Sequence, residues 1–285
     1  MTESGGAASH FTTGVITSLT NERIKRVRRL GMKKHRKAMG QVLVEGVRTL
    51  TSALAAELEF DTLFCSQAFL QDPVHKGLLI RAGRLGAKIF SVSDPVMDRI
   101  ANVASSQGVV GVVNMPVWTA DEVIAGAERA VHEGQRALLV WCDRLSDPGN
   151  LGTIIRTAHG LGAAGYFSAP NTVEVFNPAS VRAAAGSSFF LPGAEDVYPE
   201  AVFGCARSCG YQVVATAARD GLPLQDLDPG VRTLVLVGEE AEGLSADTAA
   251  RADVTVTIPT VANVESLNVA AATAIILHHF SPLRD

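Results

Sequence analysis

The chain has 285 residues, of which 47% are hydrophobic, and this is enough to form one large or two medium globular cores. Its formal net charge is −4 at pH 7. No segment reaches the roughly 18 continuous apolar residues of a membrane-spanning helix, and the first residues lack the basic start and apolar core of a secretory signal. We therefore exclude a membrane protein and expect a cytoplasmic one. Four cysteines without a CxxC pair or a histidine at zinc-ligand spacing indicate reduced thiols and no metal site.

The net charge hides a basic run between residues 21 and 40. It contains nine Lys or Arg and one Glu, a net charge of +8 that leaves −12 for the other residues. Asn21 is the expected helix cap, and Ile24, Val27 and Leu30 repeat at three-residue spacing as the buried edge. Two interpretations stay open for the opposite side: a solvated amphipathic face, or contacts with RNA phosphates, which the shortage of acids favours.

Strands and helices then alternate up to residue 114. The expected strands are QVLVEG, FDTLFCS, AKIFSVS and GVVGVVNM, and the expected helices are 47–58, 74–85 and 95–101. This pattern predicts a compact α/β domain over residues 15–114, preceded by a flexible tail at 1–14. The segment 115–135 contains Pro, polar residues and one short helical pattern, and we interpret it as a linker.

The second half, residues 136–285, also alternates. The expected elements are strand 137–142, helix 150–162, strand GYFSA, helices 178–185 and 199–209, strands YQVVATA, TLVLVG and VTVTIP, and a final helix ending at Phe280. Such alternation predicts a parallel sheet with helices on both faces, and ligands of these sheets gather at the carboxyl ends of the strands. The final helix is apolar nearly all round, so we expect it to be buried.

The stretch DPGNLGTIIRTAHGLGA, Asp147–Ala163, follows the first of these strands and opens a helix. Asn150 lies at the mouth of that helix, and Arg156 lies six residues on, beside an inward stripe of Leu and Ile, where a charge needs a partner or an anionic ligand. Asn150 is either a helix cap or a ligand, and Arg156 forms either a salt bridge or a ligand contact.

Two later blocks also place polar residues after strands. In LVLVGEEAEGLS the strand ends at Gly238, and Glu239 and Glu240 follow. In the block that begins at Val254, VTVTIPT is a strand, VANVE a loop and SLNVAAATAIILHHF a helix. Ser266 and Asn268 stand at the entrance of that helix and are either caps or ligands.

The order DPGNLGxxxRxA, GEExxGLS, IP(x6)SLNV resembles the three motifs of the SpoU branch of the SPOUT RNA methyltransferases, over roughly residues 136–280. This resemblance implies a parallel-sheet SPOUT domain with a C-terminal trefoil knot, a homodimer, and transfer of a methyl group from S-adenosylmethionine to a ribose 2′-hydroxyl. The basic helix, VEGVRTL and GVVGVV look like the N-terminal RNA-binding domain of many SpoU-type enzymes, which is a smaller α/β domain similar in fold to small ribosomal proteins.

The resemblance also implies roles for individual residues. The catalytic residues would be Arg156, Asn150, Glu240, Ser266 and Asn268. Those that bind the cofactor, largely through backbone groups, would be Thr216, Ala217, Leu236, Gly238, Ile258, Pro259, Ser266, Leu267 and Val269. Those that bind RNA would be Arg23, Lys25, Arg26, Arg28, Arg29, Lys33, Lys34, Arg36, Lys37, Arg48 and Arg182.

In the family, the arginine matching Arg156 is proposed to help deprotonate the hydroxyl. A guanidinium is effectively always protonated, so anchoring a phosphate or the forming alkoxide is the physically easier role. Glu240 could order Arg156 through a bidentate contact.

Two other classes of protein compete with this interpretation. A dinucleotide-binding oxidoreductase would need a GxGxxG run after its first strand, which the sequence lacks. A non-catalytic RNA-binding module leaves the polar residues of the three blocks without a purpose. The resemblance implies 23S ribosomal RNA as the substrate, with tRNA as the alternative. The family also includes actinomycete enzymes that protect the ribosome from antibiotics such as avilamycin or thiostrepton, and the resemblance extends to a resistance enzyme of this kind.

Overall fold

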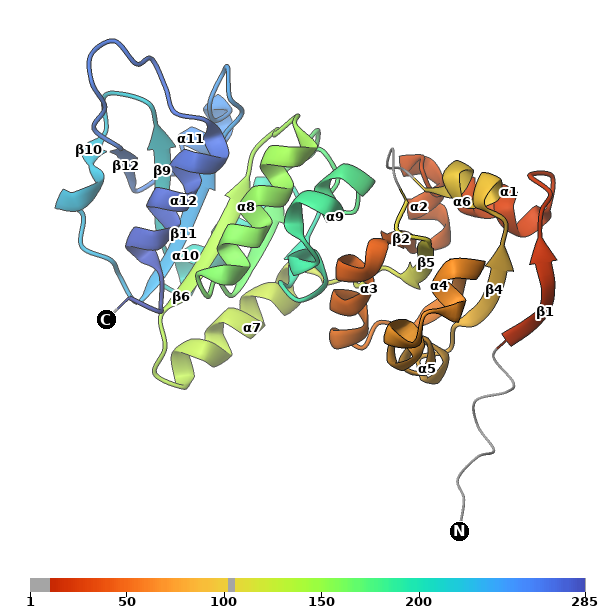
Figure 1. The fold of residues 1–285 in the computed structure, drawn as a ribbon. Coiled ribbons are helices and arrows are strands. Elements are labelled where there is room, and N and C mark those ends of the chain that lie inside the picture. The colour runs from red at the N-terminus through yellow and green to blue at the C-terminus, as the bar shows by residue number, and fades with distance from the viewer. Residues whose placement is uncertain (1–10, 102–105, 285) are drawn as a thin grey trace. The chain divides into compact units, whose positions relative to one another are not determined.

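A computed structural model describes residues 11–101 and 106–284, with side chains from residue 14 on. The chain forms two compact units (Figure 1). The first contains the described residues up to Pro116 together with Phe176–Phe189, and the second contains Val117–Val175 and the described residues from Phe190 on. The division falls after Pro116, and a short segment of the second half of the sequence, Phe176–Phe189, belongs to the first unit.

The first unit is built on a five-stranded sheet in the order β1-β4-β3-β5-β2. Strands β1, β4 and β3 are parallel, and β5 is antiparallel to both β3 and β2. The strands are β1 (Phe11–Ile16), β2 (Gln41–Glu45), β3 (Phe60–Ser66), β4 (Lys88–Val92) and β5 (Val109–Asn114). The helices are α1 (Glu22–Arg29), α2 (Lys33–Met39), α3 (Gly46–Ala55), α4 (Gln67–Gln71), α5 (Lys76–Arg84), α6 (Asp94–Ile100) and α9 (Pro178–Ala184), with 3-10 turns η1 (Pro73–His75) and η2 (Ser187–Phe189).

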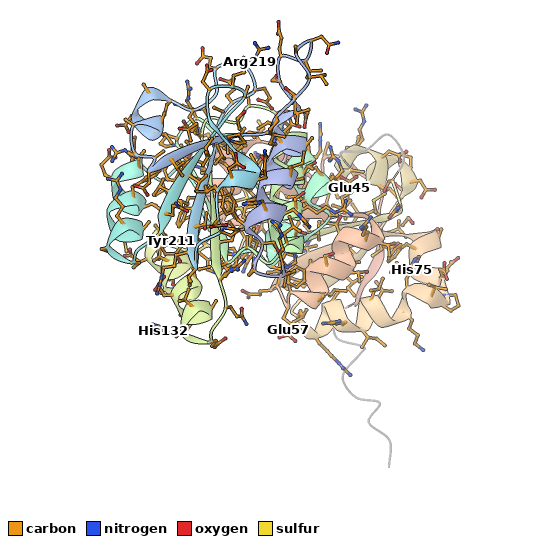
Figure 2. The ribbon with its side chains drawn as sticks, turned by 90° about the vertical axis from the view of Figure 1, so that its left-hand side faces the viewer. Glu45, Glu57, His75, His132, Tyr211 and Arg219 are labelled. Carbon is orange, nitrogen blue, oxygen red and sulfur yellow. The ribbon has the colours of Figure 1, made fainter. Side chains whose placement is uncertain are left out.

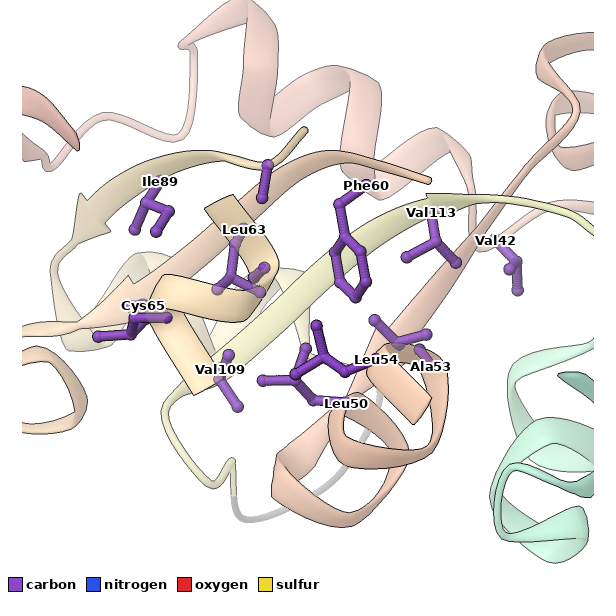
Figure 3. Packing of buried hydrophobic residues seen from close by; sticks show 14 of the residues in the cluster. Val42, Leu50, Ala53, Leu54, Phe60, Leu63, Cys65, Ile89, Val109 and Val113 are labelled. Carbon is purple, nitrogen blue, oxygen red and sulfur yellow. The ribbon is translucent and has the colours of Figure 1, made fainter. Parts of the chain in front are cut away.

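Both faces of this sheet are covered by apolar side chains, because successive strand residues point to opposite faces. Leu63 of β3 packs with α3 and α5 in one cluster, part of which is shown in Figure 3, and its neighbour Phe64 packs with α1 and α6 in another. Phe176, Val181 and Phe189 are buried in the first cluster. The segment 176–189 is thus part of the first unit's core, which the sequence pattern did not reveal.

The basic run forms two helices rather than one, because the chain turns between α1 and α2. Asn21 caps α1 as expected, since its side chain accepts a hydrogen bond from the backbone N–H of Arg23. Arg36 is only 2% exposed, and its Nη1 donates to the carbonyl oxygen of Leu30 at 2.8 Å. The expectation that Arg36 contacts RNA is therefore wrong: it is a structural side chain, whereas the other eight cations of the run are exposed. Strand β1 begins inside the expected tail 1–14, of which residues 1–10 lie outside the described residues.

The second unit is built on a seven-stranded sheet in the order β10-β12-β9-β11-β6-β7-β8, and every neighbouring pair is parallel, as predicted. The strands are β6 (Ala137–Cys142), β7 (Gly165–Ser168), β8 (Gly193–Ala194), β9 (Gln212–Ala217), β10 (Leu222–Pro223), β11 (Arg232–Val237) and β12 (Val254–Thr257). The helices are α7 (Ala120–His132), α8 (Pro148–Gly160), α10 (Pro199–Ser208), α11 (Ala246–Ala249) and α12 (Val269–Phe280), with a 3-10 turn η3 (Leu224–Asp226).

Helices cover both faces of this sheet. Helices α7 and α10 pack with Leu139 and Trp141 of β6 in one cluster, and α8 and α12 lie side by side in front of the sheet in Figure 1. Arg219, just past the carboxyl end of β9, and His132, at the end of α7, lie at opposite ends of this unit (Figure 2). Among the helices of the described residues, none has the length and apolar content needed to span a bilayer.

Two expectations about this unit are corrected. The expected linker 115–135 contains α7, whose N-terminus is capped by a capping box between Thr119 and Glu122 and which packs on β6 and β7. The last helix is buried on one side only, because Ile275 is 46% exposed.

Candidate active site at the strand ends

The three motif blocks meet at one edge of the second sheet. Strands β12, β9, β11 and β6 are parallel neighbours, with Thr257 paired to Ala217 and Val237 paired to Cys142. Their carboxyl ends therefore lie along the same edge, and the loops that follow β6, β11 and β12 all start there.

One chain of side-chain hydrogen bonds joins the three blocks. Asn150 donates from Nδ2 to Oε1 of Glu240 at 2.5 Å, and Asn268 donates from Nδ2 to Oδ1 of Asn150 at 3.1 Å. The structure therefore brings together three of the five expected catalytic residues, one from each block.

The last helix determines which way the side-chain amides in this series of hydrogen bonds point. Asn268 is the cap of α12, and its Oδ1 accepts hydrogen bonds from the backbone N–H groups of Ala270 and Ala271. Its Nδ2 must then point away from the helix, toward the oxygen of Asn150, which leaves the amide nitrogen of Asn150 for Glu240. Asn150 itself is not a cap, because Asp147 caps α8 by accepting from the N–H of Asn150 at 2.7 Å.

Arg156 differs from its expected environment. It lies about 9 Å further along the axis of α8 than Asn150, at an exposed position rather than one that needs a protein partner. Within the described part of the chain it makes no hydrogen bond or ion pair. Glu240, the expected partner of Arg156, is instead hydrogen-bonded to Asn150. Ser266 is likewise exposed and has no hydrogen bond to any described residue. Both side chains are open to a ligand.

The expected cofactor residues lie along the same edge but differ in exposure. Leu236 is buried, and its carbonyl oxygen accepts from the hydroxyl of Thr216 at 2.8 Å. A Cβ on Gly238 would come within 2.2–2.4 Å of the backbone of Gly243 and Leu244, so only glycine fits there. The half-buried members are Thr216, Ile258 and Val269, and the exposed ones are Ala217, Pro259, Ser266 and Leu267.

The GEEAEG loop, residues 238–243, is closed on itself and tied to the block after β6. Glu239 and Gly243 exchange two backbone hydrogen bonds, of 3.0 and 2.9 Å. Arg144 pairs with Glu242 at 3.0 Å, and the carboxylate of Asp143 accepts from the N–H of Ser245 at 2.6 Å. The sequence interpretation missed Asp143 and Arg144, although two charged residues directly after a fully apolar strand were a visible signal.

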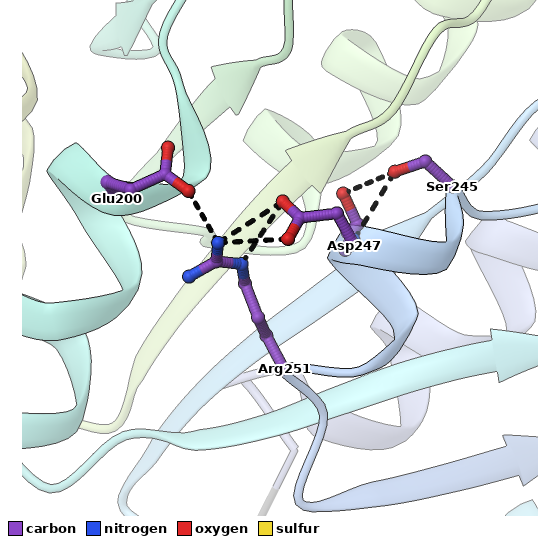
Figure 4. A network of polar contacts seen from close by, with 5 residues as sticks. Glu200, Ser245, Asp247 and Arg251 are labelled. Atoms are coloured by element: carbon purple, nitrogen blue, oxygen red, sulfur yellow. Dashed lines mark hydrogen bonds and ion pairs between the residues drawn. The ribbon is translucent and has the colours of Figure 1, made fainter.

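Helix α11, which follows this loop, is held by a separate charged network (Figure 4). Arg251 forms ion pairs with Glu200 and with Asp247 of α11, and its guanidinium lies over the ring of Phe203 at 5.8 Å. Ser245 caps α11 by accepting from the N–H of Thr248. The segment that follows the loop is thus fixed independently of Asp143 and Arg144.

The chemistry of the other nearby groups is limited. Burial and the neighbouring Asp143 raise the pKa of Cys142 to about 12, so that it stays a thiol and is no nucleophile. No cluster of three His, Cys, Asp or Glu that could hold a metal ion occurs among the described residues. Arg48 and Arg182 are exposed, but they belong to the first unit and are not part of the strand-end cluster.

An open parallel sheet with a polar cluster at its carboxyl ends defines an α/β enzyme that takes its ligands at the strand ends. Residues 137–278 match the SpoU rRNA Methylase family, and residues 21–111 match the MRM3-like substrate binding domain. The chain belongs to the SpoU rRNA Methylase family.

Relatives cover nearly the whole chain. An uncharacterized tRNA/rRNA methyltransferase of Synechocystis is 34% identical over 92% of each chain. The 23S rRNA (guanosine(2553)-2′-O)-methyltransferase RlmP of Bacillus subtilis is 28% identical over 93% of this chain and 98% of its own. The 23S rRNA (uridine(2479)-2′-O)-methyltransferase of Streptomyces viridochromogenes is 34% identical over 87% of this chain and 85% of its own.

Solved structures agree in fold. An rRNA methyltransferase from Sinorhizobium meliloti, also solved with AdoMet bound, is 30% identical, with a TM-score of 0.82 over 95% of this chain and 97% of its own. The SpoU methyltransferase AviRb from Streptomyces viridochromogenes, solved in complex with the cofactor AdoMet, is 29% identical, with a TM-score of 0.78 over 93% of this chain and 98% of its own.

Proposed function

We propose that this protein is an S-adenosylmethionine-dependent RNA 2′-O-methyltransferase that acts on 23S ribosomal RNA. The observation that carries the proposal is the hydrogen-bonded chain from Asn268 through Asn150 to Glu240, which gathers one polar residue from each motif at the edge where such sheets bind ligands. The relatives named as 23S rRNA 2′-O-methyltransferases support the substrate.

The strand-end edge suits the proposed cofactor. S-adenosylmethionine, when bound, supplies an electrophilic methyl group on a sulfonium. Its adenine and methionine ends need backbone donors and acceptors more than charged side chains. The exposed residues Ala217, Pro259 and Leu267 offer such backbone groups, and Gly238 lets the neighbouring backbone approach closely.

The expected catalytic residues then have separate tasks. A ribose hydroxyl must lose its proton as it attacks, so the site has to hold the oxygen in line and stabilise its developing negative charge. Arg156, exposed and without a protein partner among the described residues, would bind the phosphate or the forming alkoxide. Asn150 and Asn268 would hold the Glu240 carboxylate in place, and the free hydroxyl of Ser266 would contact substrate or cofactor.

The first unit would bind the RNA. The eight exposed cations of α1 and α2 outnumber the acids that pair with them, among which Glu22 pairs with Lys25 and Asp61 with Arg26. Phosphate contacts of such cations supply most sequence-independent affinity. Arg48 and Arg182, both exposed on this unit, are added to the proposed RNA contacts.

We further propose a homodimer and a knotted path. The exposed Ile275 on the mostly apolar α12 fits a helix whose outer side is covered by a second copy. Strand β12 is separated from β6 by β9 and β11, yet α12 packs on α8, so the chain passes back over the strand ends. This return supports the trefoil knot that the family resemblance implies.

An enzyme that methylates 23S ribosomal RNA would work in the cytoplasm. In its most specific form, the proposal is that this methylation protects the ribosome from an antibiotic. Expression of the protein in a sensitive host should then raise the inhibitory concentration of a ribosome-targeting drug such as avilamycin, whereas an Arg156→Ala variant should not.

The substrate is tested by incubating the purified protein with methyl-labelled S-adenosylmethionine and either unmodified ribosomal RNA or tRNA. We expect label in 23S ribosomal RNA at a single nucleotide, located by primer-extension stops. Label in tRNA alone would refute the ribosomal substrate, and no transfer to any RNA would refute the enzyme.

A further inference from the structure

Asp143 is a buried carboxylate at the carboxyl end of β6. It is only 2% exposed, its backbone N–H donates to the carbonyl of Val237 at 2.8 Å, and its Oδ2 accepts from the N–H of Ser245 at 2.6 Å. Burying a carboxylate is costly unless hydrogen bonds compensate, and a charge-assisted bond is among the stronger ones. The bond from the Ser245 N–H therefore compensates part of the cost of burying the Asp143 carboxylate.

That contact closes the loop on which Glu240 stands. Gly238 leaves β11 beside Asp143, the chain runs through Glu240, and it returns to Asp143 at Ser245. Both ends of the loop are therefore held by the same residue, one through its backbone and one through its side chain. Glu240 lies between these two anchor points and reaches Asn150 at 2.5 Å.

The other contacts of the loop do not replace this bond. The two backbone bonds between Glu239 and Gly243 close the loop on itself but do not join it to β6. The pair of Arg144 with Glu242 is partly solvent-exposed, with 69% of the Glu242 side chain accessible, and exposed pairs contribute little. The Arg251 network holds α11, beyond Ser245, and does not touch residues 238–244.

We propose that Asp143 is a positioning residue for the cofactor site: its carboxylate holds the 238–245 loop in the conformation that presents Gly238 to the cofactor and Glu240 to Asn150. The inference rests on the proposed function for its meaning, but the clamp itself is a property of the fold. Without the carboxylate the loop gains freedom that cofactor binding must then remove, so affinity falls.

The chain offers a control carboxylate at the opposite end of the sheet, which is more exposed than Asp143 and also pairs with Arg207. Asp253 accepts from the backbone N–H of Val213 at 2.8 Å, and its own N–H donates to the Val213 carbonyl, but it lies where β9 and β12 begin. Asp253→Ala thus removes a carboxylate–backbone bond of the same kind away from the proposed site.

The test compares Asp143→Ala, Asp143→Asn and Asp253→Ala in the full chain by titration calorimetry with S-adenosylmethionine. We expect Asp143→Ala to raise the Kd by about tenfold or more, the size expected when a hydrogen bond to a charged group is lost. Asp143→Asn keeps an acceptor oxygen and should stay within about threefold of the wild type, and Asp253→Ala should not change the Kd. An unchanged Kd in Asp143→Ala, or an Asn variant as impaired as the Ala variant, would overturn the proposal.

Two further measurements keep the outcome decisive. Hydrogen exchange without any ligand should show faster exchange of the peptide that contains Ser245 in Asp143→Ala. This reads the clamp even if the wild type binds no S-adenosylmethionine, a result that would refute the proposed function alone; unchanged exchange would refute the clamp. Should the Ala variant not fold, Asp143→Glu replaces it: the added methylene displaces the carboxylate, so the Kd must rise for Glu and not for Asn.

Discussion

Asn268 donates from Nδ2 to Oδ1 of Asn150 at 3.1 Å, although 118 positions separate the two residues in the chain. The other end of the same amide caps α12. One side chain therefore couples the start of the last helix to the geometry of the strand-end site, so that the two functions can be separated by substitution.

Asn268→Asp should keep the cap and lose the site. Aspartate is as good a cap as asparagine, so we expect the melting temperature to stay within a few degrees of the wild type. A carboxylate cannot donate to Asn150, so methyl transfer should fall by about tenfold or more. Asn268→Ala should lose both, with about 1 kcal/mol of stability removed with the cap. Thermal unfolding and labelled methyl transfer measure the two effects, and equal activity of the Asp variant and the wild type would refute the coupling.

Arg156→Lys and Arg156→Ala should affect activity without affecting stability. The side chain is exposed and has no partner among the described residues, so its removal should change the free energy of unfolding by less than about 0.5 kcal/mol. The lysine keeps the charge but not the planar fork, so a purely electrostatic role predicts substantial activity and a bidentate role predicts little. Full activity in Arg156→Ala would remove this residue from the proposed machinery.

Arg36→Ala and Lys33→Ala should separate structure from RNA binding within the basic run. The buried Arg36 bonds to Leu30, and its loss should cost about 2 kcal/mol or more, measured by denaturant unfolding. The exposed Lys33 should cost less than about 0.5 kcal/mol. It should instead reduce the slope of log affinity for RNA against log salt by about 0.7. An unchanged slope would exclude Lys33 from phosphate contact.

Glu128→Gln should weaken the second unit at neutral pH and flatten its acid unfolding. The hydrogen bond from Arg232 holds the pKa of Glu128 below its ordinary value of 4.5. A lowered folded-state pKa means that this stabilisation is present above pH 4.5 and is lost as the pH falls toward the folded-state value. The Gln variant should therefore be less stable at pH 7 and lose less on acidification. A variant that parallels the wild type at every pH would show that the pair contributes nothing.

Ile275→Glu should dissociate the proposed dimer while leaving the monomer folded. The side chain is 46% exposed in the single chain, so a charge there is tolerated unless a second copy covers it. Light scattering after gel filtration should report a dimer for the wild type and a monomer for the variant. A wild type that is monomeric at micromolar concentration would end the dimer proposal.

The sequence predicted the second sheet well because its strands are short apolar runs bounded by turn residues, as in ALLVWC before Asp143. It also predicted that the three blocks meet, since parallel strands place their carboxyl ends along one edge. The observed chain from Asn268 to Glu240 agrees with that prediction.

The errors arose where a residue's role depends on distant partners. Arg36 looks like its exposed neighbours in sequence, and only the turn between α1 and α2 buries it against Leu30. The Pro, the polar residues and the single short helical pattern of 115–135 indicate a linker, yet Val123, Ile124 and Ala127 of α7 all reach the core. The placement of 176–189 in the first unit depends on Phe176 and Phe189, whose partners in the core lie in the first half of the sequence.

The central claim is that the strand-end cluster transfers a methyl group to a ribose oxygen. The most direct measurement is alkaline hydrolysis of RNA labelled by the wild type and by Asn150→Ala, because a 2′-O-methyl group makes the adjacent phosphodiester resistant to alkali. We predict label in alkali-resistant dinucleotides with the wild type and little or none with Asn150→Ala. Label released in mononucleotides, which would place the methyl on a base, or full activity without Asn150, would contradict the account.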